Sequence, residues 1–180
     1  ALEGRYPRLS VEEDFFVNYG FLPRATQALM HPRVPRTRWS PARWRKADEV
    51  LAFVRERGNV HPREVDACFQ HGRVSNWFGG MSSATTQLLD GMHYRGMLRI
   101  ARREGGIRVY AARDADAPRV DRAEVARRLD TLIDVIVAKY APLPARSLGQ
   151  LVGHLRAGVP QWADARAAAL TRAKARLPGT

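Results

Sequence analysis

Hydroxyl and guanidinium side chains gather in one stretch of this 180-residue chain. Short hydroxyls at the start of a helix can approach phosphates or base edges closely, and a guanidinium group binds phosphate or guanine through two parallel hydrogen bonds. The hydroxyl residues are Ser82, Ser83, Thr85 and Thr86. The guanidinium residues are Arg95, Arg102, Arg103 and Arg108. These residue types predict contacts with a nucleic acid.

The residues around the hydroxyl group have the pattern of a helix. A hydroxyl at Ser82 or Ser83 can cap the free N–H groups of the first turn. Leu88, Leu89 and Met92 recur at helical spacing and predict a buried stripe. The other faces are expected to carry Ser83, Thr86, Gln87, Asp90 and His93. Glycine suits a left-handed C-cap, so the helix is expected to end at Gly96.

Two alternating segments, 97–102 and 107–111, follow that helix. Glu104-Gly105-Gly106 between them predicts a tight hairpin turn. The order helix, strand, turn, strand is that of a recognition helix and a β-wing. We therefore expect a two-stranded wing with arginine on one face, contacting double-stranded DNA.

The residues upstream predict two further helices. One spans Pro41–Arg57 and ends at Gly58-Asn59, and Val60 follows as a short strand. The other spans Pro62–Gln70, with proline in its first turn, where the missing N–H costs nothing. A loop over 71–80 then leads to the recognition helix. Residues 41–113 are thus expected to form a winged helix-turn-helix.

Three helices are expected after a linker at 114–118. They are Glu124–Tyr140, Ser147–Arg156 and Trp162–Leu177, in the order that opens a winged helix. Residues 1–23 hold two short helical candidates and an aromatic stretch, and 24–46 is a basic, proline-containing linker. The predicted fold class is mainly α with small β-wings (α+β). The predicted domains are a winged-helix remnant with its linker (1–40), a central winged helix (41–113) and a winged-helix-like helical unit (119–180).

The charge of the chain favours a polyanionic partner. The formal net charge is +12 and the sequence pI is about 11.0. A GC-rich genome is an equally good explanation for the excess of arginine over lysine. The sequence shows no membrane-spanning run and no signal peptide. A cytoplasmic, nucleoid-associated protein is expected, with Cys68 as a buried thiol in a reducing compartment.

Other chemistry has little support in the sequence. The histidines never pair at metal-ligand spacing, so we expect no metal, and no cofactor motif occurs. His71 and His93 flank the recognition helix, where surface or core histidines are the favoured interpretation. Asp130 and Asp134 share a helix face and are expected to form exposed ion pairs with Arg127 and Arg128.

The central segment resembles the YcaQ/AlkZ-like family of DNA crosslink-repair glycosylases. That family carries an aromatic-rich turn, a helix, a Gly-x-Leu step and a wing ending in Arg-x-Tyr. The matching residues are Trp77, Phe78, Gly79, Leu88, Leu89, Gly96, Met97, Leu98, Arg103, Arg108, Val109 and Tyr110. An upstream segment of the family ending in Leu-Pro is matched by Glu13, Phe15, Phe21, Leu22 and Pro23. The resemblance implies tandem winged helices and a DNA-repair function.

Two departures from the family pattern limit what the resemblance implies. The family's His-Glu pair falls on Val17 and Asn18. The family's catalytic motif is Gln, an aliphatic residue, then Asp or Gln, and no glutamine here has that context: Gln27, Gln70, Gln87, Gln150 and Gln161. In the family this motif lies further upstream, so we assign no catalytic residue and expect a fragment or a relative without the chemistry.

The expected function is binding of double-stranded DNA as part of a glycosylase acting on alkylated or crosslinked bases. The alternatives are a non-enzymatic winged-helix regulator and a winged helix that only contacts proteins. A missing N-terminal domain of the same protein is a further expected partner, because Phe15, Phe16, Tyr19 and Phe21 would otherwise expose apolar surface.

Overall fold

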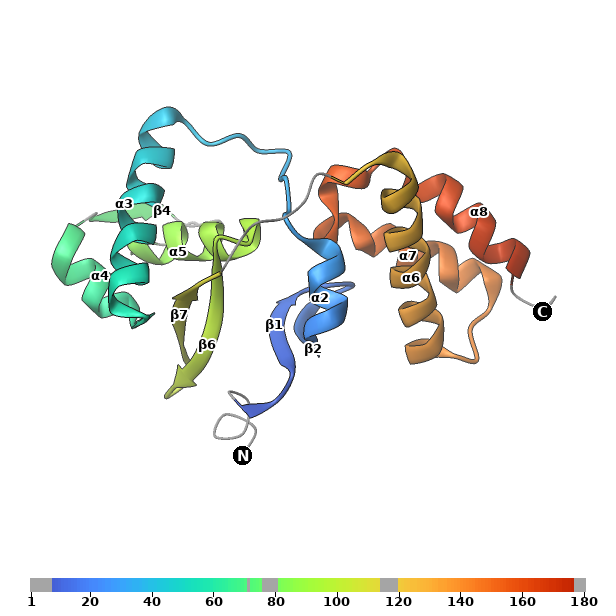
Figure 1. The fold of residues 1–180 in the computed structure, drawn as a ribbon, viewed down its shortest axis with the longest axis horizontal. Coiled ribbons are helices and arrows are strands. Elements are labelled where there is room, and N and C mark those ends of the chain that lie inside the picture. The colour runs from blue at the N-terminus through green and yellow to red at the C-terminus, as the bar shows by residue number, and fades with distance from the viewer. Residues whose placement is uncertain (1–7, 71, 76–80, 114–119, 177–180) are drawn as a thin grey trace. The chain divides into compact units, whose positions relative to one another are not determined.

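A computed structural model describes residues 8–70, 72–75, 81–113 and 120–176 of the chain (Figure 1). More than half of the described residues are helical, and the sheets are small and antiparallel, which confirms the α+β class. The chain divides into two compact units. The first comprises residues 1–12 and 37–115, and the second comprises 13–36 and 116–180. The predicted domains at 1–40, 41–113 and 119–180 stay a prediction.

The first unit is built on three helices. Helix α3 (Pro41–Arg57) begins at the cap Ser40, whose Oγ accepts from the backbone N–H of Arg43, and ends at Gly58 with φ 78°. Helix α4 (Pro62–Phe69) begins at a capping box between His61 and Glu64. Helix α5 (Ala84–Arg95) ends at Gly96 in the left-handed conformation, as the sequence predicted.

A three-stranded sheet completes the first unit, in the order β3 (Asn59–Val60), β7 (Ile107–Ala112), β6 (Leu98–Glu104). Gly105 and Gly106 form the two-residue turn between β6 and β7, and both have positive φ, which the favoured type I′ hairpin requires. The register shifts between Ile100 and Arg102, which marks a β-bulge. A further hairpin, β4 (Arg73–Ser75) with β5 (Met81–Ser83), lies where the sequence predicted a loop. The motif residues Trp77, Phe78 and Gly79 lie outside the described residues.

The apolar stripe of α5 lies where the helical spacing predicted it, since Leu88, Leu89 and Met92 are buried. Helix α3 buries Ala47, Val50 and Val54, whereas its Trp44 is 42% exposed. The expectation for Cys68 is wrong, because its side chain is exposed at the end of α4. The short helix buries only its Val65 face, so a small side chain on another face stays in contact with water.

In its described residues the second unit holds four α-helices and most of an N-terminal hairpin, of which residues 11 and 12 belong to the first unit. The hairpin pairs β1 (Val11–Phe15) with β2 (Tyr19–Pro23), and α2 (Arg24–Met30) follows directly. The C-terminal part holds α6 (Arg122–Tyr140), α7 (Ala145–Gly158), the 3₁₀ turn η2 (Pro160–Trp162) and α8 (Arg166–Arg176). Its core is formed by α6, α7 and α8 together with Phe16, Leu22 and Met30.

Two sequence predictions for the N-terminal segment are wrong. The described part of 1–23 contains a β-hairpin and no α-helix. The basic linker contains α2, whose Met30 is fully buried. The exposed apolar surface is smaller than the sequence predicted, because Phe16 is only 6% exposed. Phe21 is 42% exposed.

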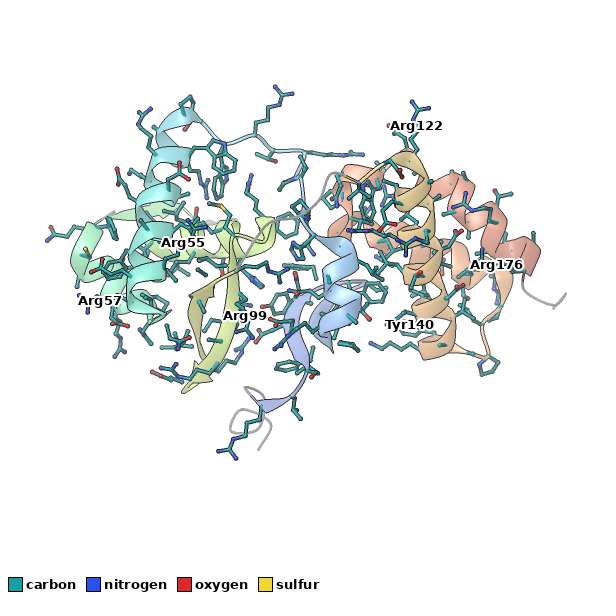
Figure 2. All side chains as sticks on the ribbon, viewed as in Figure 1. Arg55, Arg57, Arg99, Arg122, Tyr140 and Arg176 are labelled. Carbon is teal, nitrogen blue, oxygen red and sulfur yellow. The ribbon has the colours of Figure 1, made fainter. Side chains whose placement is uncertain are left out.

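The aspartates of α6 also have partners other than those predicted. Asp130 accepts from Arg172 and Asp134 from Arg176, so both pairs join α6 to α8 (Figure 2 labels Arg176). Arg127 and Arg128 instead bind Glu124 on their own helix. Among the described residues, no helix combines the length and apolar character that a membrane crossing requires.

Candidate nucleic-acid interface

The start of α5 uses its hydroxyl groups mainly inside the protein. The Ser83 Oγ caps the helix by accepting from the backbone N–H groups of Thr85 (3.2 Å) and Thr86 (3.4 Å), and it donates to the Asp66 carboxylate at 2.9 Å. The Thr85 side chain is fully buried, so we leave it out of the interface. Thr86 is exposed, and the side chain of Ser82 lies outside the described residues.

The wing arginines do not share one face, so that expectation is wrong. Arg103 and Arg108 are directly opposite each other in the β6–β7 ladder and lie on the same face. Arg102 is paired with Val109 and lies on the other face, because consecutive residues of a strand point to opposite faces. Arg102 forms an exposed ion pair with Glu104, and Arg103 donates to the carbonyl O of Gly106 at 2.8 Å.

Asp90 links α5 to strand β7. Its Oδ1 accepts from the Arg108 Nη1 at 2.9 Å and from the Tyr110 hydroxyl at 2.8 Å. Burial raises the pKa of Tyr110 above its ordinary value, the negative charge of Asp90 raises it further, and Arg108 opposes the rise. The phenol therefore stays protonated and donates to Asp90, which fixes the distance between α5 and β7.

A hollow of about 430 Å³ lies between the start of α4, the outer side of α5 and the wing. We call it the wing hollow. Its lining residues are His61, Pro62, Arg63, Asp66, Thr86, Asp90, Arg103, Gly106, Ile107, Arg108 and Tyr110. Three arginines and a histidine around a concave surface suit a phosphate group. The two aspartates are already bound to Ser83 and to Arg108 and Tyr110, which lowers their repulsion of an anion.

Arg95 does not lie on the wing. Its guanidinium stacks on the Trp39 ring at 3.7 Å and donates to the carbonyl O of Thr37 at 2.9 Å. The Arg43 guanidinium lies 4.8 Å from the same ring, and Trp44 packs edge-on against Trp39 at 5.0 Å. Burial lowers the pKa of Arg95, and the nearby charge of Arg43 lowers it further. The predicted DNA contact of Arg95 is therefore accompanied by a packing role that the sequence did not indicate.

The glycine at position 91 allows this tryptophan packing. A Cβ on Gly91 would lie 2.6 Å from the Trp39 ring, closer than such atoms approach in proteins. The sequence pattern gave a signal here, since glycine in the middle of a helix is costly and needs a reason. We find the reason in the close contact with Trp39.

A buried polar cluster in the second unit is the other arrangement that could carry chemistry. Both oxygens of Asp14, which is fully buried, are occupied. Oδ2 accepts from Gln27 at 2.9 Å and lies 2.7 Å from the His31 Nε2, and Oδ1 accepts from Arg33 at 3.1 Å and from the Phe15 backbone N–H at 2.7 Å. A carboxylate so fully engaged has no oxygen left to activate water. The cluster is therefore structural.

Arg33 extends that cluster to the C-terminal helices. Its Nε donates to the carbonyl O of Gly158 at 2.7 Å. The N-terminal hairpin and the end of α7 are thereby held together through a buried ion pair. No sequence motif marked these residues, because they are distant along the chain and lie in different elements.

Metal binding has no support among the described residues, which contain no group of three or more His, Cys, Asp or Glu able to hold an ion. His93 is buried rather than presented on an outer face of α5, and its Nδ1 lies 3.2 Å from the carbonyl O of Leu98. The expected outward placement of His93 is wrong, and His71 lies outside the described residues.

Comparison with known proteins gave one result. A family model described as DNA glycosylase AlkZ-like matches residues 1–179. No curated protein and no solved structure matches the chain.

Proposed function

The chain belongs to the AlkZ-like DNA glycosylase family, and we propose that its first unit is a winged helix that binds double-stranded DNA. The family is one of DNA-repair enzymes, so DNA is its partner. The order α3, β3, α4, α5, β6, β7 supports the winged-helix interpretation. The inserted β4–β5 hairpin lies directly before α5 and leaves this order intact.

The wing hollow is the observation that carries the proposal. It places Thr86 of α5 and the paired wing residues Arg103 and Arg108 around one concave surface. A duplex phosphate there would be bound by guanidinium donors, while the exposed edge of α5 faces a groove. The first two turns of α5 carry no Asn or Arg, so binding depends on the backbone more than on base identity.

The second unit extends the proposal to tandem winged helices. Helices α6, α7 and α8 follow the order that opens a winged helix, and the N-terminal hairpin β1–β2 is the small sheet of this unit. In this proposal the second unit binds DNA and does not excise a base. No glutamine of the chain has the family's motif, and both oxygens of Asp14 already accept hydrogen bonds. The substrate of the proposed glycosylase is a duplex with alkylated or crosslinked bases, and this chain binds that duplex.

Binding to a short random duplex across a salt series tests the proposal. Each phosphate contact contributes about 0.9 to the slope of log affinity against log salt. We expect a slope of several units for the chain, and Arg103→Ala and Arg108→Ala should each lower it by about one. Arg55→Ala, at the far end of α3, is the control that removes the same charge (Figure 2).

Other outcomes would favour the alternatives. Weak affinity that does not depend on salt would contradict DNA binding and favour a protein-contact module. A dimer with a preference for a palindromic site would favour a non-enzymatic regulator instead.

A further inference from the structure

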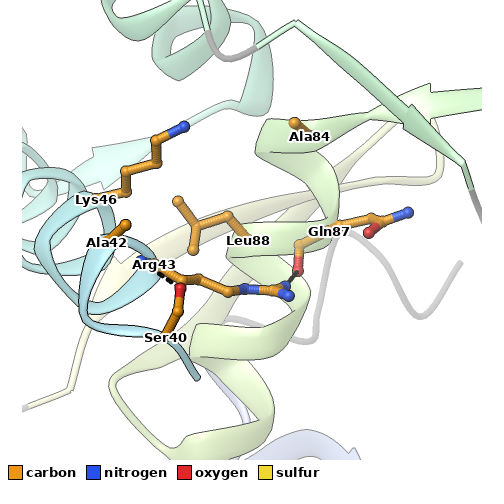
Figure 3. A pocket seen from close by; sticks show the side chains of 7 residues that line it. All are labelled: Ser40, Ala42, Arg43, Lys46, Ala84, Gln87 and Leu88. Carbon is orange, nitrogen blue, oxygen red and sulfur yellow. Dashed lines mark hydrogen bonds between the residues drawn. The ribbon is translucent and has the colours of Figure 1, made fainter. Parts of the chain in front are cut away.

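A second hollow lies on the other side of α5, between that helix and the start of α3 (Figure 3). Its volume is about 270 Å³. Ser40, Arg43 and Lys46 line it from the α3 side, and Ala84 and Leu88 line it from α5. We call it the Lys46 hollow. In Figure 3 the Lys46 side chain extends over the Leu88 side chain, and Arg43 crosses below it toward α5.

The Lys46 hollow carries two positive charges and no carboxylate among its lining residues. Within the described part of the chain, neither Arg43 nor Lys46 has a carboxylate partner. The wing hollow differs, because two aspartates line it and Arg108 is already paired with one of them. Among the described residues, the Lys46 hollow is therefore the side of α5 whose positive charge has no neutralising carboxylate.

Arg43 is held in position without being neutralised. Its Nη2 donates to the carbonyl O of Gln87 at 3.3 Å, and its guanidinium lies over the Trp39 ring. Burial lowers its pKa, which shows that a partly desolvated cation lines the hollow. A guanidinium fixed on one side by a ring and a carbonyl leaves its remaining donors for an anion. Lys46 adds an exposed, flexible ammonium group beside it.

The two hollows lie on opposite flanks of α5. At 3.6 residues per turn, Ala84 and Leu88 lie roughly 160° around the helix from Thr86 and Asp90. Gln87 lies between these two sides, and Figure 3 shows its side chain extending away from Arg43. A helix in the major groove has one phosphate backbone on each flank. The spacing of the hollows matches that arrangement.

We propose that the Lys46 hollow holds a phosphate group of the DNA backbone, on the strand across the groove from the one at the wing hollow. This inference rests on the proposed DNA binding of the first unit. It assigns Arg43 and Lys46 as phosphate ligands, whereas the sequence placed both only within the basic linker at 24–46. Arg43 is the positioned, directional donor, and Lys46 is the point charge.

The test compares Lys46→Gln with Arg55→Gln in the complete chain. Both substitutions remove one charge from α3, and residues 46 and 55 are roughly 14 Å apart along the helix axis. Lys46 is exposed, so its replacement leaves the packing intact. One phosphate contact changes affinity by about 3.5-fold between about 50 and 200 mM salt. We expect the affinity of Lys46→Gln to depend less on salt than that of the wild type, by this factor over the same salt range. Arg55→Gln should have the wild-type salt dependence.

Arg43→Gln provides the second variant, with circular dichroism as the check that the unit remains folded. It should lower the slope as Lys46→Gln does. A steep wild-type slope that both variants leave unchanged would overturn this inference and keep the proposed function. A flat wild-type slope would overturn the proposed function itself.

A titration with inorganic phosphate distinguishes a site for DNA phosphate from a site for the free anion. Titration of the chain with inorganic phosphate, followed by NMR at the Lys46 and Arg43 resonances, should show weak binding that competes with the duplex. Phosphate binding that depends on Lys46 but leaves the DNA slope unchanged would point to a site for the free anion and overturn the assignment to DNA.

Discussion

Replacing Gly91 with alanine should destabilise the first unit, although alanine is the better helix former. An alanine Cβ would lie 2.6 Å from the Trp39 ring, so the indole or the helix has to move. Displacing the indole separates it from the Arg95 guanidinium, now 3.7 Å away, and from the edge of Trp44. The substitution therefore stabilises α5 through the higher helix propensity of alanine and destabilises the unit through the lost packing of Trp39.

The magnitude follows from these two effects. Overpacking a fitted site costs about 1 to 3 kcal/mol. Alanine in place of glycine in a helix gains about 1 kcal/mol. The expected net loss is thus about 0 to 2 kcal/mol. Gly153 of α7 is the matched control, because a Cβ there meets nothing within 4 Å. Gly153→Ala should stabilise the second unit by about 0.5 to 1 kcal/mol.

Urea unfolding of both variants, followed by far-ultraviolet circular dichroism, measures the difference. A double-mutant cycle with Trp39→Ala isolates the contact. Without the indole, Gly91→Ala should become stabilising by about 1 kcal/mol, which reverses its sign. The reasoning fails if Gly91→Ala stabilises the wild-type chain as much as Gly153→Ala does, because Trp39 would then not occupy this position.

Two further predictions concern buried polar groups. Asp14→Asn should cost the second unit about 3 to 5 kcal/mol, because it leaves the buried Arg33 without its ion pair. The exposed Asp134→Asn control should cost about 1 kcal/mol or less, and equal urea midpoints for the two variants would refute the role of the cluster. Tyr110 should lose its proton only above about pH 10 in the folded chain, because burial and Asp90 raise its pKa, and tyrosinate absorbance compared between the wild type and Tyr110→Phe measures this. Above about pH 10 the unfolded chain binds fewer protons than the folded chain, so the free energy of unfolding falls as the pH rises. Tyr110→Phe should remove part of that fall. A fall of equal size in the variant would contradict the raised pKa of Tyr110.

Local sequence signals were sufficient for the elements whose ends are set by nearby residues. Ser83 and Gly96 set the ends of α5, and the Gly105-Gly106 pair set the turn between β6 and β7, because capping and positive φ are local requirements. The apolar period of α6 likewise placed its buried face, with Leu132 and Ile136 fully buried. The family resemblance was carried by residues in these same elements and is confirmed over 1–179.

Tertiary structure decided which side chains are available to a ligand. The sequence treated Thr85 and Thr86 alike, but the first is buried and the second is exposed, because one helical position turns the side chain by about 100°. The register shift in β6 between Ile100 and Arg102 decided that Arg103, and not Arg102, is paired with Arg108, and no residue pattern announced it. The ion pair of Asp14 with Arg33 joins positions that are distant in sequence, and only packing brings them together.

The sequence by itself determined helices α3 to α8, the β6–β7 hairpin and the basic character of this chain, since these depend on local propensity and composition. Only the tertiary structure decided that two hollows flank α5 and that no carboxylate lines the Lys46 hollow. Neutralisation of a cation depends on which carboxylates come within a few ångströms in space, and sequence spacing does not set that distance.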